Sequence, residues 1–215
     1  MPDNSHAIDK IVCTNAGKRF VFEWVIRDFN FSFHRNKCYG IRGANGSGKS
    51  TLLKLLSGHS TPSKGTISFF KNETEINISG VYESITFCAP YIELIEEMTV
   101  SELLKFHHGL RPFSNHANML EVLKDLPFKG LADKRIGELS SGMKQRIKLM
   151  LAILTDTSVI LLDEPGSNLD QSGKKWFEDL LRIHMQDKIV IIASNEEDDL
   201  RLVESIISME DYKKA

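Results

Sequence analysis

The sequence lacks a basic excess, a long apolar run and an N-terminal targeting pattern. Its 215 residues include 27 Lys and Arg against 29 Asp and Glu, so it carries no basic surplus to hold a nucleic-acid backbone. The longest unbroken apolar run, Leu149–Leu154, is far shorter than the roughly 18 residues that indicate a membrane span. The first residues do not have the basic-then-apolar pattern of a signal peptide. These absences argue against a nucleic-acid-binding protein and against an integral membrane protein.

Cysteine is scarce, and no group of histidines has metal-ligand spacing. The three cysteines are widely separated and lie in apolar, strand-like contexts: Cys13, Cys38 and Cys88. An odd number at such spacing predicts reduced core thiols of a cytosolic protein, rather than a disulfide framework or a zinc site. Three histidines also fit no ligand pattern, and we expect them on exposed helix surfaces: His107, His108 and His116.

Strand and helix patterns alternate along the chain and predict an α/β protein. Residues 8–42 are β-rich and contain two alternating aromatic sets, most of which we expect to pack in the core: Phe20, Phe22 and Trp24, then Phe29, Phe31 and Phe33. Apolar runs at 159–163 and 189–193 predict buried parallel strands. We expect one domain, with residues 1–90 and 146–215 forming its core and β subdomain and residues 91–145 a helical insertion.

The predicted insertion contains two amphipathic helices. Thr99 and Glu102 fit a capping box that opens the first, and its apolar side consists of Leu103, Leu104 and Phe106. The second is marked by apolar residues at helical spacing: Met119, Leu120, Val122, Leu123 and Leu126. Further along, the acidic run 196–199 is expected to be a solvated helix start.

Residues 43–51, here called the phosphate loop, match the pattern G-x-x-x-x-G-K-[ST] between a predicted strand and a predicted helix. Its glycines let successive N–H groups point at phosphate oxygens near a positive helix terminus. Lys49 is expected to reach the β- and γ-phosphates, and Ser50 to bind Mg²⁺. The alternative is a glycine-rich turn that matches by chance. The predicted nucleotide-binding residues are Asn45, Gly46, Ser47, Gly48, Lys49, Ser50 and Thr51.

A second candidate site is the Asp163-Glu164-Pro165 sequence that follows the apolar strand Val159–Asp163. The carboxyl end of a parallel strand faces the ligand crevice. Asp163 is therefore expected to complete the Mg²⁺ site begun by Ser50. Glu164 is expected to orient and deprotonate the attacking water. On its own this sequence is equally compatible with a plain turn, and its pairing with the phosphate loop favours the catalytic interpretation.

Between these two motifs, Leu139–Arg146 reads L-S-S-G-M-K-Q-R. This segment resembles the L-S-G-G-Q or L-S-G-G-M signature of the nucleotide-binding subunits of ATP-binding cassette (ABC) transporters, with Ser141 in place of the first signature glycine. The turn Ser167–Asp170 resembles the S-A-L-D turn of that family, whose acidic end communicates between sites. The phosphate loop, signature, Asp-Glu-Pro motif and turn occur in family order, and the resemblance covers nearly the whole chain.

The resemblance implies the ABC ATPase fold: a P-loop NTPase core with a mainly parallel sheet, an N-terminal antiparallel β subdomain and a helical insertion. It also implies a head-to-tail dimer, with a homodimer expected on ATP binding, in which Ser140 and Gly142 of one subunit close on the γ-phosphate held by the other. ATP and Mg²⁺ are the implied cofactors. The implied partner is a separate transmembrane permease, which places the protein in the cytoplasm at the inner face of the membrane.

Two positions depart from the family pattern, and one aromatic residue matches it. Tyr91 stands where family members usually have a Gln that contacts Mg²⁺, and Asn195 where they usually have a His that bonds the γ-phosphate. Asn195 can donate a hydrogen bond to phosphate but cannot carry a positive charge or shuttle a proton, so we predict slow hydrolysis. Phe20 occupies the position of the aromatic ring that stacks on adenine, although core packing explains it equally well.

Three functions are therefore weighed. The first is a transport ATPase subunit whose ATP-driven dimerisation acts on a permease through the helical insertion. Its basic segment after Ser141 resembles that of single-cassette exporter ATPases, and the short C-terminus disfavours importer subunits that carry added regulatory domains. The second is a soluble cassette acting on ribosomes or DNA, which the acidic balance and the lack of long insertions disfavour. The third is an ATP-gated interaction module with weak or absent hydrolysis, suggested by Tyr91 and Asn195 but opposed by Glu164.

Overall fold

A five-stranded parallel sheet forms the centre of the computed structural model, which describes residues 7–114 and 130–212. Neighbouring strands lie in the order β6-β7-β8-β3-β9, and every pairing is parallel. The strands are β3 (Lys37–Arg42), β6 (Ile85–Cys88), β7 (Val159–Asp163), β8 (Ile189–Ala193) and β9 (Ser205–Ser208). All residues of β7 and β8 are buried, as their unbroken apolar runs predict for strands covered on both faces.

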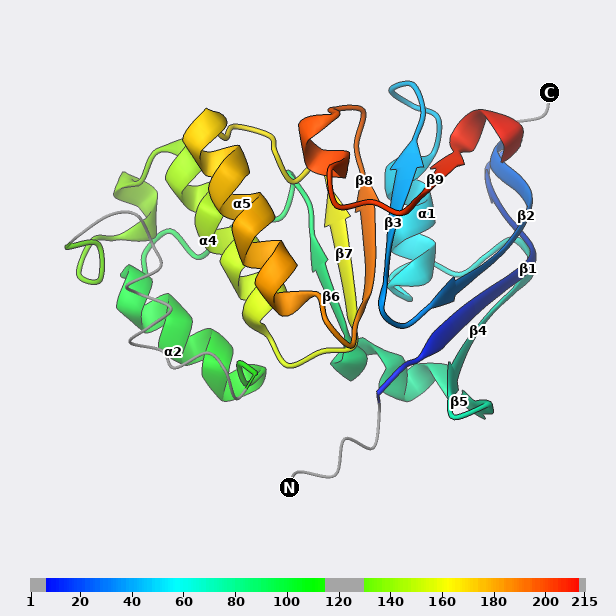
Figure 1. Cartoon of the computed structure of the whole chain (residues 1–215), viewed down its shortest axis with the longest axis horizontal. Helices are drawn as coiled ribbons and strands as arrows, with labels where there is room; N and C mark the ends of the chain where they lie inside the picture. The colour runs from blue at the N-terminus through cyan, green and yellow to red at the C-terminus, as the bar shows by residue number, and fades with distance from the viewer. Residues whose placement is uncertain (1–6, 115–129, 213–215) are drawn as a thin grey trace.

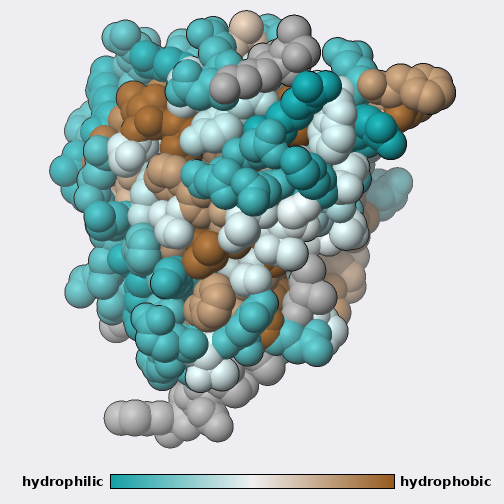
Figure 2. Space-filling view, turned by 90° about the vertical axis from the view of Figure 1, so that its right-hand side faces the viewer, coloured by the Kyte–Doolittle hydropathy of each residue, from teal (hydrophilic) through white to brown (hydrophobic). Residues whose placement is uncertain are grey.

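A second sheet, antiparallel and four-stranded, lies beside the first (Figure 1). Its order is β2-β1-β4-β5, and its strands are β1 (Lys10–Phe20), β2 (Glu23–His34), β4 (Lys64–Lys71) and β5 (Thr74–Ile76). The alternating Phe29, Phe31 and Phe33 lie on β2, where Phe29 and Phe33 are fully buried and Phe31 partly buried. The face in Figure 2, on the side of the N-terminal sheet, is mostly hydrophilic with scattered apolar patches.

The parallel sheet separates two apolar clusters because its side chains alternate between faces. Leu162 and Ile192 pack on the side of helices α4 and α5, whereas Leu161 and Ile191 pack on the side of α1 and the N-terminal sheet. The helices are α1 (Lys49–Leu56), α2 (Val100–Leu110), α4 (Ser141–Leu154) and α5 (Gln171–His184). Short 3-10 helices are η1 (Ile78–Ser84), η2 (Ile136–Glu138), η3 (Asp198–Leu200) and η4 (Met209–Tyr212). The expected α/β fold is confirmed.

Capping residues begin the helices where the sequence indicates. Thr99 and Glu102 form a complete capping box at α2, and Ser140 accepts the Met143 amide at the start of α4. The expected apolar side of α2 is buried at Leu103 and Leu104, but Phe106 is 46% exposed.

The predicted second helix of the insertion, residues 119–126, lies outside the described residues, and the proposed division into subdomains stays a prediction. In the described part of the chain, no helix is long and apolar enough to cross a membrane.

The expected strand containing both Phe20 and Phe22 is wrong, because a turn separates them. β1 ends at Phe20 and β2 begins at Glu23, and these two residues pair across the hairpin. Val21 has a positive φ of 53°, which reverses the chain, and Phe22 is 91% exposed. Turn geometry therefore overrides the period-2 pattern, and these side chains lie at a hairpin tip rather than in the core.

Two expectations about polar residues also need correction. His107 is half-buried, not exposed: its Nε2 lies 2.8 Å from Thr155 Oγ1, and its ring stacks on Phe113. Within the acidic run, Asp199 is 3% exposed, because η3 turns its carboxylate toward the protein interior instead of toward water. Cys13, Cys38 and Cys88 are buried and free, and their expected place in the core is confirmed.

Candidate functional site

The phosphate loop joins the carboxyl end of β3 to the start of α1, as its pattern predicts. Gly48 is the N-cap of α1 with φ 104°, a conformation that favours glycine. A Cβ at Gly48 would lie 2.9 Å from Val25 Cγ1, so the loop packs directly against β2. Lys49 is 5% exposed, and its Nζ donates to the Gly43 carbonyl at 2.7 Å. The loop is thus curled around its own lysine.

One surface pocket collects most of the predicted nucleotide-binding residues together with a carboxylate. It is lined by Val25, Asn45, Gly46, Ser47, Gly48, Lys49, Ser50, Thr51 and Glu164. The Ser47 hydroxyl is buried without a hydrogen-bond partner among the described residues. Backbone amides at a helix start, a lysine and an unpaired hydroxyl form a set of donors suited to phosphate oxygens. Val25 was not predicted as a lining residue, since its strand pattern alone indicates only core packing.

Asp163 and Glu164 follow β7 in different environments. Asp163 is 2% exposed. Burial raises its pKa, while a hydrogen bond with Ser50 and the nearby Lys49 charge act to lower it. Its Oδ1 atom has no hydrogen-bond partner within the described residues. A buried carboxylate oxygen beside a serine hydroxyl supplies the hard oxygen donors that Mg²⁺ prefers, so these two residues fit that ion.

Glu164 is exposed and faces the phosphate-loop pocket. Its φ is 46°, a left-handed conformation that a non-glycine residue rarely adopts and that occurs at functional sites. The Glu164 amide donates to the Ala193 carbonyl at 2.8 Å, which fixes this turn to the neighbouring strand β8. The carboxylate is thereby directed toward the pocket in which Lys49 and Ser50 lie.

Asn195 follows β8 and contacts the first residue of the phosphate loop. Its Oδ1 accepts the Gly43 amide at 3.2 Å. Since this contact uses the carbonyl oxygen, the amide nitrogen retains its two donors. The next strand along the sheet from β7 therefore brings a donor residue to the same loop, and Lys49, Asp163, Glu164 and Asn195 all meet at the carboxyl edge of the sheet.

Ser140 and Gly142 do not lie in this pocket. They line a separate surface hollow with Ser141, Met143, Arg146, Asn168, Leu169, Asp170 and Ser172. Ser140 and Ser141 are exposed, so the start of α4 is open to a second molecule. A Cβ on Gly142 would lie 2.8 Å from the Asn168 carbonyl oxygen, which explains why glycine stands there.

Two side chains of α4 connect this hollow to the loops after β7. Gln145 is buried, and its Nε2 donates to the Pro165 carbonyl at 2.9 Å. Arg146 lies 3.0 Å from the Asp170 carboxylate and packs over the Trp176 ring. Sequence reasoning assigned neither residue a role, because each contact joins segments about 20 residues or more apart.

Tyr91 and Phe20 occupy more peripheral positions. The Lys54 ammonium on α1 lies 4.5 Å from the centre of the Tyr91 ring. Burial, and then the Asp163 charge, raise the pKa of Tyr91 to about 12. Phe20 is 52% exposed under the Lys18 ammonium at 5.4 Å, and it is not among the residues that line the phosphate-loop pocket. Core packing is therefore not its role, and adenine stacking stays a prediction.

Comparison with known proteins finds one family consistently. The family model described as "ABC transporter" matches residues 26–167. The chain is 32% identical over 205 residues to Nod factor export ATP-binding protein I of Burkholderia lata, covering 93% of this chain and 67% of that protein. It is 30% identical over 177 residues to the retinal-specific phospholipid-transporting ATPase ABCA4 of Homo sapiens, covering 81% of this chain but 8% of that much longer protein.

Solved structures agree with this result. A Pyrococcus furiosus structure described as an ABC transporter ATP-binding protein has a TM-score of 0.81 and 26% identity, covering 95% of this chain and all of that one. A dimeric bacterial ABC transporter cassette has a TM-score of 0.78 at 21% identity, covering 92% of this chain and 93% of that one. At that identity the second likeness concerns the fold alone.

Proposed function

The chain belongs to the ABC transporter family as an ATP-binding subunit, and we propose that it hydrolyses ATP at an interface between two head-to-tail copies. The observation that carries the proposal is the pocket in which the phosphate loop and Glu164 face each other. Lys49 and the loop amides bind the phosphates. Glu164 takes the proton of the attacking water. Asn195 donates to the γ-phosphate in place of the usual histidine, so turnover is slow.

Ser50 and Asp163 would hold Mg²⁺, which when bound neutralises charge on the β- and γ-phosphates. Their fit rests on the hydroxyl and the buried, unpaired carboxylate oxygen described above. Phe20 would stack on adenine from the exposed end of β1. In this proposal, residues of the chain itself bind all three parts of the Mg²⁺–ATP complex: the base, the phosphates and the metal ion.

The separation of the two hollows supports the proposed dimer. Ser140 is an exposed donor at a helix start, Gly142 is partly buried beside it, and neither lines its own phosphate-loop pocket. In a second copy turned head to tail, they would close on the γ-phosphate, since a helix N-terminus favours an anion. ATP then stabilises the dimer, and hydrolysis releases it.

A permease would dock in the groove between α2 and β6. The groove is lined by Ile95, Phe106 and Leu110, whose exposed fractions are 40%, 46% and 68%. Exposed apolar side chains that lie together favour binding of a partner. We assign it a segment of an export-type permease, since relatives of this chain are named for export and phospholipid transport. Lys148 lines the groove and donates to the Pro90 carbonyl. The adjacent Tyr91 contacts Lys54 of α1, and this gives a route from the groove to the nucleotide.

The test is ATP-dependent association measured by sedimentation. Wild-type protein should be monomeric alone and dimeric with ATP. Lys49→Ala should lose ATP binding and dimerisation, Ser140→Tyr should bind ATP without dimerising, and the control Lys64→Ala, a surface ion pair of the N-terminal sheet, should match wild type. A monomer at saturating ATP would contradict the proposal. Dimerisation without turnover, even with a permease present, would instead support the ATP-gated module suggested by Tyr91 and Asn195.

A further inference from the structure

Asp199 is a buried carboxylate between the two catalytic loops, and the proposed chemistry does not use it. It lies on η3 and is 3% exposed. The Ser194 hydroxyl donates to its Oδ2 at 2.6 Å, and Ser194 Oγ in turn accepts the Glu196 amide at 3.0 Å. Ser194 directly precedes Asn195, so this contact fixes the backbone from which Asn195 reaches the phosphate loop.

The other oxygen of Asp199 faces the loop that carries Glu164. A Cβ on Gly166 would lie 2.2 Å from Asp199 Oδ1, so only glycine allows this approach. Oδ1 has no partner of hydrogen-bond geometry in the described part of the chain, although the nearby Gly166 amide acts to lower the pKa of Asp199 against the rise caused by burial. The Asp199 carboxylate therefore forms a hydrogen bond with Ser194 on one loop and lies close to Gly166 on the other without a hydrogen bond.

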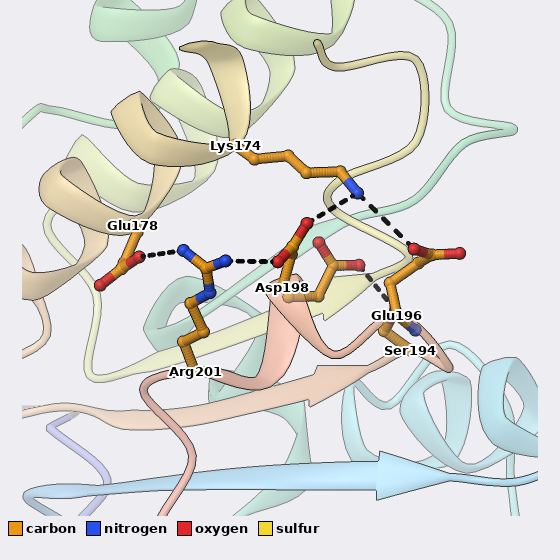
Figure 3. Close-up of polar contacts among 7 residues, drawn as sticks. Lys174, Glu178, Ser194, Glu196, Asp198 and Arg201 are labelled. Atoms are coloured by element: carbon orange, nitrogen blue, oxygen red, sulfur yellow. Dashed lines mark hydrogen bonds and ion pairs between the residues drawn. The ribbon is translucent and has the colours of Figure 1, made fainter. Parts of the chain in front are cut away.

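Charged pairs connect this region to α5 (Figure 3). Lys174 reaches from α5 to Asp198 at 3.2 Å and to Glu196 at 3.6 Å. Arg201 lies between Asp198 and Glu178, at 2.6 Å and 3.5 Å respectively. Since Asp170, the N-cap of α5, lines the hollow of Ser140, these pairs attach η3 to a helix that begins at the predicted partner surface.

We propose that Asp199 is a positioning residue that holds the Glu164 loop, through Gly166, and Asn195, through Ser194, in one arrangement. This inference rests on the proposed ATPase function. A closed pocket needs both loops placed together, because small displacements of catalytic groups are costly. The carboxylate matters because it presents one acceptor oxygen to the Ser194 hydroxyl and its other oxygen toward the Gly166 backbone. Asn offers only one acceptor, and its amide nitrogen would face a donor.

The decisive variant is Asp199→Asn, which keeps the shape and one acceptor but removes the buried charge. Turnover should fall on the order of 10-fold to 100-fold, with ATP affinity unchanged. The melting temperature should stay equal or rise, because the variant no longer buries a charge whose pKa burial has raised. Amide hydrogen exchange should become faster at residues 164–168 and 194–196 together. The control is Asp179→Asn, which removes the exposed ion pair of Asp179 with Lys175 on α5. This variant should match wild type.

Unchanged turnover in Asp199→Asn, or turnover and melting temperature that fall in parallel, would overturn this inference while leaving the proposed function intact. Wild-type exchange rates in both segments would overturn it as well. An inactive wild-type protein would contradict the proposed ATPase, and the exchange measurement would then decide the positioning role alone. A double-mutant cycle with Asn195→Ala adds a further check, since two residues acting together lose less in combination than the sum of their separate effects.

Discussion

The Arg146 guanidinium of α4 lies 3.0 Å from the Asp170 carboxylate that caps α5. Asp170 accepts the Gly173 amide and the Ser172 hydroxyl, and these bonds, more than Arg146, lower its pKa. Arg146 itself is buried and also donates to the Ser172 hydroxyl at 3.1 Å, so this side chain joins α4 to the turn that ends at Asp170 and to the start of α5. The two segments of the proposed partner surface are therefore joined by a direct contact.

Arg146→Ala should remove the contact between α4 and the Asp170 turn at the proposed partner surface. We expect ATP-dependent dimerisation to weaken about 10-fold, because α4 loses its contact with the Asp170 turn. Arg146→Lys should restore only part of it, since an ammonium cannot reproduce the planar guanidinium that bonds Asp170 and stacks on Trp176. Sedimentation across an ATP titration measures both variants. Equal dimerisation in wild type and Arg146→Ala would contradict the coupling.

Glu164→Gln should separate ATP binding from hydrolysis. Loss of a general base typically lowers turnover by roughly 100-fold or more, whereas the neutral side chain leaves the phosphate loop intact. The variant should therefore accumulate as an ATP-bound dimer. Phosphate release and size-exclusion chromatography measure the two effects, with the exposed Glu210→Gln as control. Turnover close to wild type would remove Glu164 from the proposed mechanism.

Asn195→His should raise turnover, by about 10-fold if the imidazole acts in proton transfer. Asn195→Ala should lower it, because the donor to phosphate and the acceptor for Gly43 are both lost. Steady-state ATPase assays at saturating ATP compare the three proteins. The proposal of slow wild-type hydrolysis fails if wild type already equals Asn195→His, or if its turnover matches that of vigorous cassette ATPases.

His107 should make stability depend on pH. Burial lowers the pKa of His107 from 6.5 to about 4, so between these values the unfolded chain binds a proton that the folded protein does not. Its contribution is fully present above pH 6.5 and is lost as pH falls toward 4. Between pH 4 and pH 6.5, the urea midpoint should therefore change less with pH in His107→Gln than in wild type. A pH dependence in His107→Gln equal to that of wild type would refute the assignment.

Much of the site was predictable because it consists of short segments. Fewer than ten consecutive residues make up each of these segments: the phosphate loop, the Asp163-Glu164 pair after a buried strand, and the Ser140 cap. Glycines, serines and apolar runs indicate the backbone conformation that each of them needs. The same local chemistry predicted the α2 capping box and the buried strands β7 and β8.

Other properties depended on packing between distant segments. Phe22 follows an aromatic strand pattern yet lies exposed at a hairpin tip. Asp199 belongs to an acidic run yet is buried against Ser194 and Gly166. No spacing rule relates Gln145 to Pro165 or Tyr91 to Lys54, because such contacts depend on how whole helices and strands pack.

Most strands, loops and helix starts, and their order, could be predicted from the amino acids alone, since those choices depend on each residue's own conformational preferences and near neighbours. Which polar groups share the edge of the sheet, which become buried and which stay exposed for a second copy became known from the folded arrangement. Burial and charge pairing act through space, and their partners are set by the packed arrangement of all the elements together.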